Sequence, residues 1–382
     1  MANNNDNKVL NVPPLRFPEF SGEWKMCTIG ELTTKVGSGV TPRGGEAVYK
    51  TEGHPFVRSQ NVGLGNLLLD DIAFIDEETH LRQKSTELQF NDVLLNITGA
   101  SIGRSALVDK QIVGGNVNQH VCIIRTKENL VPSFICSFLL STYGQRQIDS
   151  FQAGGNRQGL NFEQIKSIKI TIPSKDEQIK IAKLLRAIDE RIATQNKIID
   201  KLQSLIKGIA QNVARNNKPN IRLSECLECS SSTLQESDVC KNGTYPVYGA
   251  NGIVGYLDNY NTEKEAVYII KDGSGVGTVS YVTGKCSATG TLNTLQAKEG
   301  YSLQYLYYML KVFNFEPYKT GMAIPHIYFK DYGKAKIFCP SYTEQLKYAR
   351  LLSAIDNKLS AEQSILTDLS LQKQYLLRQM FI

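Results

Sequence analysis

The chain has 382 residues, 41% of them hydrophobic and 21% charged, a composition that indicates a globular protein of more than one domain. No apolar run approaches the roughly 18 residues that a membrane span needs, so we expect a cytoplasmic protein with no membrane partner. The net charge of +6 is compatible with nucleic acid. Because there is no dense Lys/Arg block, any such contact must be spread over shaped surfaces.

The N-terminal part combines an expected tail with a first globular region. Residues 1–15 begin with an asparagine-rich stretch that lacks the architecture of a secretion signal, and we expect them to be disordered. Residues 24–170 then read as short strands between Gly and Asn turns, with one helix near the end, at 131–140.

A long helix is predicted from about Asp176 to Ala214. Pro173 ends the preceding strand, and Ser174 or Asp176 can cap the helix. Apolar residues recur every seven positions in two sets offset by four, as at the core positions of a coiled coil. These sets are Leu185, Ile192, Ile199, Ile206 and Val213, and Ile181, Ile188, Gln195, Leu202 and Ile209. Gln195 is the one polar member.

A second globular region, residues 220–338, repeats features of the first in the same order. The buried strand and Gly-rich turn at 92–104 correspond to 266–278, and the helix at 131–140 corresponds to 302–310. We also expect 116–120 to correspond to 291–294, and the loop at 154–160 to 321–327. The loop side chains differ between the copies, so two similar domains are expected to recognise two different things.

A second long helix is predicted from Thr343 to near the C-terminus. Pro340 precedes it as Pro173 precedes the first, an offset of 167 residues (340 − 173). Its heptad positions are Leu352, Leu359, Leu366, Lys373 and Met380, and Tyr348, Ile355, Glu362, Leu369 and Leu376. Glu362 aligns with Gln195, and polar residues inside an apolar core fix its register. An antiparallel arrangement need not place these two side chains together.

These patterns predict an α+β protein of two similar mixed α/β domains, separated by two long helices that form an antiparallel coiled coil with pseudo-twofold symmetry. The simpler alternative is that each helix packs on its own globular domain.

The motifs for catalysis and metal binding are incomplete. Cys226 and Cys229 form a single CxxC pair without a second one. Gly273–Gly277 is GxGxG rather than a nucleotide-binding GxGxxG, and the Asn/Asp-Pro-Pro-Tyr tetrad of amino-methyltransferases is missing. The nuclease-like ExK at Glu23–Lys25 has no acidic partner to hold a metal with it. We therefore predict no catalytic residue, no metal and no cofactor.

Several short motifs, taken in order and in duplicate, carry a family resemblance. They are residues 14–24 (PLRFPEFSGEW), residues 38–42 (SGVTP), the turn from Gly99 to Arg104, and Pro-x-x-x-Glu-Gln at 173–178 and again at 340–345. Together they resemble the specificity (S) subunits of type I restriction–modification systems over nearly the whole chain. The second half lacks the SGVTP segment and has YPVYGANG at 245–252 instead.

The resemblance implies two target recognition domains, at 16–173 and 217–340, and two helical spacers, at 174–216 and 341–382. Each domain would read one half of a split site in double-stranded DNA. The spacers would set the distance between the half-sites and dock two methyltransferase subunits, through which restriction subunits bind.

The candidate DNA-binding residues are side chains on turns that match the donors and acceptors of base edges. In the first domain they are Thr41, Arg43, Arg58, Gln60, Asn61, Ser101, Arg104, Asn118, Gln119, Asn156, Arg157 and Gln158. In the second they are Asn251, Lys271, Ser274, Thr278, Asn293 and His326. Each could instead be a solvated loop residue or stabilise a turn.

Two other functional classes remain as alternatives to a non-catalytic DNA-reading subunit. One is a methyltransferase or nuclease that acts alone, which would modify DNA without a partner. The other is a coiled-coil adaptor, which would show no salt-dependent DNA binding.

Overall fold

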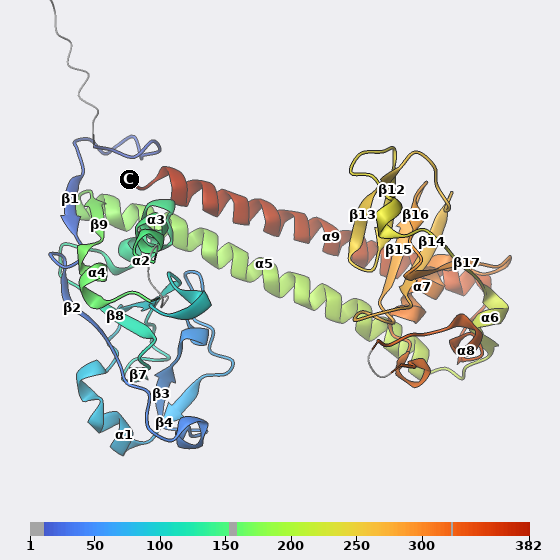
Figure 1. Cartoon of the computed structure of the whole chain (residues 1–382), viewed down its shortest axis with the longest axis horizontal. Coiled ribbons are helices and arrows are strands. Elements are labelled where there is room, and N and C mark those ends of the chain that lie inside the picture. Colours follow the sequence, from blue (N-terminus) through green and yellow to red (C-terminus); the bar gives the residue numbers. More distant parts are fainter. Residues whose placement is uncertain (1–10, 153–158, 322–323) are drawn as a thin grey trace, which may run out of the picture. The chain divides into compact units, whose positions relative to one another are not determined.

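The computed structural model describes residues 11–152, 159–321 and 324–382 (Figure 1). The chain divides into two compact units. Unit 1 contains Met1–Thr194 and Leu366–Ile382, and unit 2 is the continuous segment Gln195–Ile365. Each unit therefore holds one globular part and a section of both long helices.

Unit 1 contains three small sheets. The four-stranded sheet has the order β2-β8-β5-β6, a three-stranded sheet has the order β4-β3-β7, and β1 pairs with β9. All neighbours are antiparallel except β3 and β7. The strands are β1 (Lys25–Thr28), β2 (Thr33–Ser38), β3 (His54–Val57), β4 (Ala73–Ile75), β5 (Val93–Asn96), β6 (Ser105–Leu107), β7 (Asn116–Val117), β8 (Val121–Thr126) and β9 (Lys169–Ile172).

Unit 2 repeats this topology strand by strand. Its sheets have the orders β11-β17-β14-β15, β13-β12-β16 and β10-β18, and the one parallel pair is again the matching one, β12 with β16. The strands are β10 (Ile221–Arg222), β11 (Leu227–Ser231), β12 (Tyr245–Gly249), β13 (Gly252–Leu257), β14 (Glu265–Ile270), β15 (Val279–Thr283), β16 (Ser287–Ala288), β17 (Leu292–Ala297) and β18 (Lys336–Ile337). The predicted duplication of two mixed domains is confirmed.

The helices repeat in part. The predicted helices near residues 131 and 302 are α2 and α7, and α4 and α8 start 167 residues apart. Helix α3 follows α2 in unit 1, whereas the described residues of unit 2 form a 3-10 turn, η6 (Glu316–Tyr318), in the same interval. The short helices are α1 (Glu77–Arg82), α2 (Pro132–Leu140), α3 (Thr142–Ser150), α4 (Phe162–Ser167), α6 (Leu223–Cys226), α7 (Leu303–Lys311) and α8 (Phe329–Tyr332).

The two long helices are α5 (Lys175–Arg215, 41 residues) and α9 (Tyr342–Gln379, 38 residues), close to the predicted bounds. In unit 1, one hydrophobic core contains Ile181, near the start of α5, and Met380, which directly follows the end of α9. Further along, Asp189 of α5 pairs with Lys373 of α9, so the two helices run in opposite directions within this unit. All of the predicted heptad positions are buried or half-buried.

A polar contact interrupts the apolar packing of the helices in unit 2. The Gln195 side-chain amide donates to the Glu362 main-chain carbonyl at 2.9 Å and also to the Glu362 carboxylate. Both side chains are buried. Lys358 pairs with the same carboxylate, and the donors from Lys358 and then Gln195 lower the pKa of Glu362. The two aligned polar residues therefore meet, and a shift of register would leave both groups buried without a partner.

The glutamine of each Pro-x-x-x-Glu-Gln motif fixes the start of a long helix. The buried Gln178 accepts from the main-chain N–H of Val131 at 2.9 Å and donates to the carbonyls of Asn129 and Pro173, both at 3.1 Å. In unit 2, Gln345 makes the equivalent contacts with Ser302 N–H and the Pro340 carbonyl, both at 2.9 Å. The motif thus ties α5 to the start of α2 and α9 to the start of α7.

The N-terminal segment after residue 10 is packed against unit 1. Asn11 is hydrogen-bonded to the main chain of Trp24 in both directions, and Leu15 N–H donates to the Gln379 carbonyl at 3.0 Å. Arg16 makes a bidentate ion pair with the buried Glu177, with both N···O distances at 2.8 Å. Residues 11–15 of the expected tail are therefore ordered, and residues 1–10 lie outside the described residues. The described part of the chain has no helix that could span a membrane.

Candidate nucleic-acid interface

In unit 1, a Gly-rich turn between β5 and β6 lies at one end of the four-stranded sheet. Gly99 and Gly103 have φ of 71° and 84°, a conformation that favours glycine. The Ile97 carbonyl accepts from Leu160 N–H at 2.8 Å, and Ile97 N–H donates to the His120 carbonyl at 3.0 Å. The turn therefore meets two other segments, the one after β7 and the one before α4.

Unit 2 has the same meeting point of three loops, which we call the junction, at the turn between β14 and β15. Gly273 and Gly277 have φ of 94° and 90°. The Lys271 carbonyl accepts from Ile327 N–H at 2.9 Å, and Lys271 N–H donates to the Thr291 carbonyl at 3.0 Å. Because the same main-chain contacts recur, this junction is a scaffold that holds three loops together independently of their side chains.

The side chains on the two junctions differ. In unit 1, Thr98 Oγ1 and His120 Nδ1 are 2.6 Å apart, and Gln119 Nε2 lies 3.3 Å from His120 Nε2. In unit 2, His326 Nδ1 lies 2.7 Å from the Asp272 carboxylate. An imidazole bonded to a carboxylate through one nitrogen keeps the other nitrogen for a ligand. The two junctions therefore offer different hydrogen-bonding groups at equivalent places.

No arrangement for metal chemistry is present in the described part of the chain. No group of three or more His, Cys, Asp or Glu side chains there could hold a metal ion. Burial raises the pKa of Cys226 to about 12, so this residue is a neutral thiol at physiological pH.

The repeated architecture agrees with a family of known proteins. The family model "Type I restriction modification DNA specificity domain" matches the chain twice, over residues 21–204 and 219–370. The chain belongs to this family. It acts as a DNA-recognition subunit and not as an enzyme.

Relatives with known names support this assignment. The chain is 25% identical to a putative type I specificity subunit of Mycoplasma genitalium over 320 residues, which are 76% of this chain and 81% of the relative. It is 23% identical over 202 residues to the specificity subunit of the type I restriction enzyme EcoKI of Escherichia coli, covering 50% of this chain and 41% of that relative. A solved S subunit from M. genitalium has the same fold, with a TM-score of 0.66 at 19% identity over 97% of this chain and 99% of that one.

Several predicted contact residues of this specificity subunit are exposed near the two junctions. In unit 1, Asn96 Nδ2 donates to Ser59 O at 2.8 Å and to Ser101 Oγ at 3.1 Å, which brings the 58–61 segment to the Gly-rich turn. Thr41 N–H lies 3.4 Å from Gln119 Oε1. The exposed candidates are Arg43, Gln60, Arg104, Gln119, Asn251, Ser274 and Thr278, and the half-buried ones are Thr41, Arg58, Ser101, Lys271 and His326.

Three predicted residues are buried and hydrogen-bonded within the fold. Asn61 is 0% exposed and its amide donates to Leu68 O and Asp71 Oδ1, both at 2.9 Å. Asn118 accepts from His120 N–H at 3.0 Å, and Asn293 donates to the Tyr332 hydroxyl at 3.0 Å. These buried amides shape the loops.

The expected correspondence of 116–120 with 291–294 is displaced. His120 O and Thr291 O accept the equivalent bonds, from Ile97 and Lys271, so Thr291 is the counterpart of His120. Asn293 therefore lies inside β17, where it pairs with Ile269 and Ser231, and not in the loop. Asn156, Arg157 and Gln158, which were also predicted to bind DNA, lie outside the described residues.

An aromatic group beside the second junction was not predicted from the sequence. Tyr328 is 47% exposed, its ring lies 6.5 Å from that of His326, and the Lys330 ammonium lies 5.2 Å from the Tyr328 ring centroid. Exposed aromatic and cationic groups together are typical of nucleic-acid surfaces. The signal in the sequence is the Tyr-Phe-Lys run at 328–330, whose Phe329 is half-buried.

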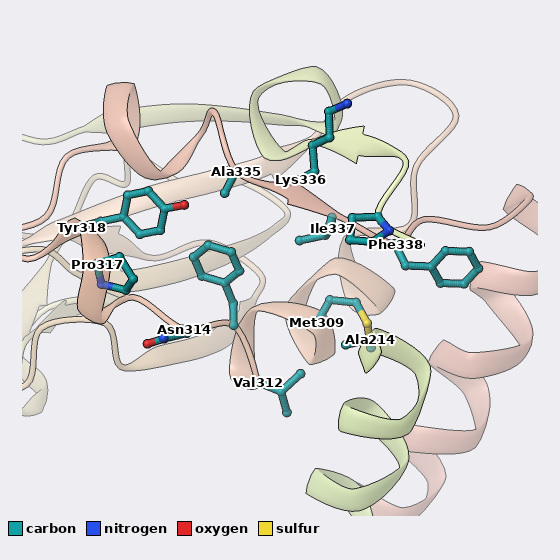
Figure 2. Close-up of a pocket in the computed structure, with 12 residues that line it drawn as sticks. Ala214, Met309, Val312, Asn314, Pro317, Tyr318, Ala335, Lys336, Ile337 and Phe338 are labelled. Carbon is teal, nitrogen blue, oxygen red and sulfur yellow. The ribbon is translucent and has the colours of Figure 1, made fainter. Parts of the chain in front are cut away.

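A cavity of about 420 Å³ in unit 2 marks a difference between the two copies (Figure 2). In unit 1, Gln147 of α3 is hydrogen-bonded to both the N–H and the carbonyl of Lys169 in β9. Lys336 is the counterpart of Lys169 in β18, and it lines the cavity with Met309, Tyr318 and Ile337. The cavity thus lies where the described residues of the shorter unit 2 segment form no counterpart of α3, and its lining is mainly apolar.

Proposed function

We propose that each unit reads one half of a bipartite site in double-stranded DNA through the side chains gathered at its Gly-rich junction. The target recognition domains would be residues 16–173 and 217–340, and the helical spacers 174–216 and 341–382. The observation that supports this most strongly is the repetition of the same main-chain junction with different side chains. Two junctions with the same main-chain contacts but different side chains are suited to the reading of two different DNA sequences.

Within each junction, we assign base reading to polar side chains that are exposed or half-buried. In unit 1 these include Gln60, Arg104 and Gln119, and in unit 2 Lys271, Ser274 and His326. Arginine and lysine donate to guanine, and glutamine matches adenine in the major groove. Thr41 lies on the loop after β2, beside Gln119, and we place Thr41 and the nearby Arg43 at the same surface.

We further propose that the long helices set the gap between the half-sites and dock two methyltransferase subunits, through which restriction subunits bind. The relatives support this partnership, since EcoKI is named as a restriction enzyme with a specificity subunit. The buried contact between Gln195 and Glu362 supports a fixed register, which a spacer needs. Catalysis would then reside in the partner subunits.

The experiment is to reconstitute the chain with the methyltransferase subunit of its own system and to sequence methylated bases in a randomised DNA library. We expect two short fixed blocks separated by a constant gap of unspecified sequence. A single continuous block would overturn the bipartite proposal. The chain without its partner is expected to transfer no methyl groups, and DNA binding that is insensitive to salt would contradict phosphate contact.

A further inference from the structure

Lys373 joins both long helices to a loop of the first globular part, all within unit 1. It lies at a heptad core position of α9 and is only 15% exposed. Its ammonium lies 2.5 Å from the carboxylate of Asp189 on α5 and donates to the Leu64 main-chain carbonyl at 3.2 Å. Burial raises the pKa of Asp189, while the bond from Lys373 acts in the opposite direction. A single cation therefore connects three separate segments.

The main chain of the loop approaches this ion pair closely at a glycine, Gly65. Gly65 has φ of 98°, a conformation that side chains rarely adopt. A Cβ added at Gly65 would lie 3.3 Å from Lys373 Nζ and 3.4 Å from Asp189 Oδ2. Gly65 N–H donates to Ser105 O at 2.9 Å, which also ties the loop to β6. These contacts therefore join this loop to this ion pair.

The loop that Lys373 holds, residues 58–72, is internally cross-linked. Asp71 accepts from Asn61 at 2.9 Å and from Gln60, and its carbonyl accepts from Arg58 at 2.7 Å. Leu68 N–H donates to the Asn61 carbonyl at 2.9 Å. Because of these bonds, the loop is expected to move as one body, so a contact at Leu64 also fixes the position of Gln60.

Unit 2 has no counterpart of this connection among its described residues. The residue 167 positions after Asp189 is Asp356, which accepts from the Tyr308 hydroxyl at 3.2 Å. The residue 167 positions before Lys373 is Ile206, a buried apolar side chain. The coiled coil therefore does not require a lysine at this position, and the role of Lys373 is specific to the first globular part.

We propose that Lys373 is a positioning residue for the reading of the first half-site. It holds the 58–72 loop, with Gln60 at its exposed end, against α5 and α9 without touching DNA. The inference rests on the proposed function, because it requires that unit 1 reads one half of a bipartite site.

The test uses the reconstituted complex and the same randomised methylation library. Arg104→Ala first identifies the half-site that unit 1 reads. Lys373→Met is expected to reduce base discrimination in that half-site roughly 3- to 30-fold, the range for residues that act on a site through intervening contacts. The other half-site and the gap stay unchanged. Lys373→Arg, which keeps a donor, is expected to retain most of the discrimination.

Two further variants separate positioning from folding. Gly65→Ala keeps both charged residues but strains the loop backbone and crowds the ion pair, so it is expected to affect the same half-site as Lys373→Met. Tyr308→Phe removes the hydrogen bond to Asp356, the unit 2 residue aligned with Asp189, and is expected to leave the first half-site unchanged. Equal loss at both half-sites, or normal discrimination in folded Lys373→Met and Gly65→Ala, would overturn the inference. A wild-type complex that marks no bipartite site would instead overturn the proposed function.

Discussion

If the long helices set the gap between the half-sites, lengthening both by the same amount should lengthen the gap. Four residues would be inserted in α5 between Gln195 and Lys201, and four in α9 between Ile355 and Lys358. In unit 2 both insertions then lie on the same side of the contact between Gln195 and Glu362, which is preserved together with the neighbouring ion pair. Four residues are also the insertion that a heptad repeat absorbs most easily.

The expected change follows from helix geometry. Four residues at 1.5 Å each add about 6 Å to each helix. A base-pair step of duplex DNA is about 3.4 Å, so the gap should grow by one or two base pairs. Four residues are slightly more than one helical turn of 3.6 residues. The coiled coil distributes the small excess rotation along its length.

The assay is methylation of a randomised library by the complex that contains the lengthened chain. Both half-sites should keep their bases while the constant gap increases. A variant with the insertion in α5 alone is the control, because it shifts the core positions of one helix against the other and should lower stability. An unchanged gap with full activity in the double insertion would refute the idea and leave the helices only a docking role.

The remaining predictions concern stability and base reading. Phe381→Ala removes a fully buried ring just after α9 and should cost about 3–5 kcal/mol in denaturant unfolding, whereas Tyr375→Ala, at a half-exposed position within α9, should cost about 0.5 kcal/mol or less. Because the lysine and glutamine donors lower the pKa of Glu362, its contribution is present above about pH 4.3 and is lost as pH falls through the lower native value. Melting curves from pH 7 to pH 3 should therefore show less acid sensitivity in Glu362→Gln than in the parent. Arg104→Ala and Lys271→Ala should each weaken a different half-site by about 1–3 kcal/mol in library methylation, and a loss shared by both half-sites would contradict separate reading.

The elements that sequence reasoning located well are those with strong periodicity. The heptads predicted both long helices to within a few residues, and the offset of 167 residues predicted the duplicated fold. Gln195 and Glu362 stood out because polar residues are rare in such a core. Their direct contact was left open, since the register of an antiparallel pair depends on the turns and domains between the helices.

The loops were predicted less well, for reasons that lie in the main chain. Asn61 and Asn293 resemble base-reading amides in the sequence, but burial depends on the strand register and on the hydrogen bonds of neighbouring segments. The interval that contains α3 is longer in unit 1 than its counterpart in unit 2, and this changes the offset between the copies from 171 to 167 residues. A single alignment offset therefore could not place every loop.

The role of Lys373 was also out of reach of sequence patterns. Its heptad position indicated a core residue, and the sequence gives no sign that a loop about 300 residues earlier would present a carbonyl to it. Such long-range contacts are decided by packing, which local periodicity does not describe.

The buried glutamine at the start of each long helix has a consequence for how new specificities could arise. Gln178 and Gln345 bond only to main-chain atoms of the globular part they follow. The attachment therefore depends on the position of the main chain and not on the identity of the side chains. A grafted or recombined globular part with unrelated loop sequences would be held at the same angle to its helix, provided that its short helix begins at the same point. Sequence diversity in the loops can thus accumulate without a compensating change at the joint.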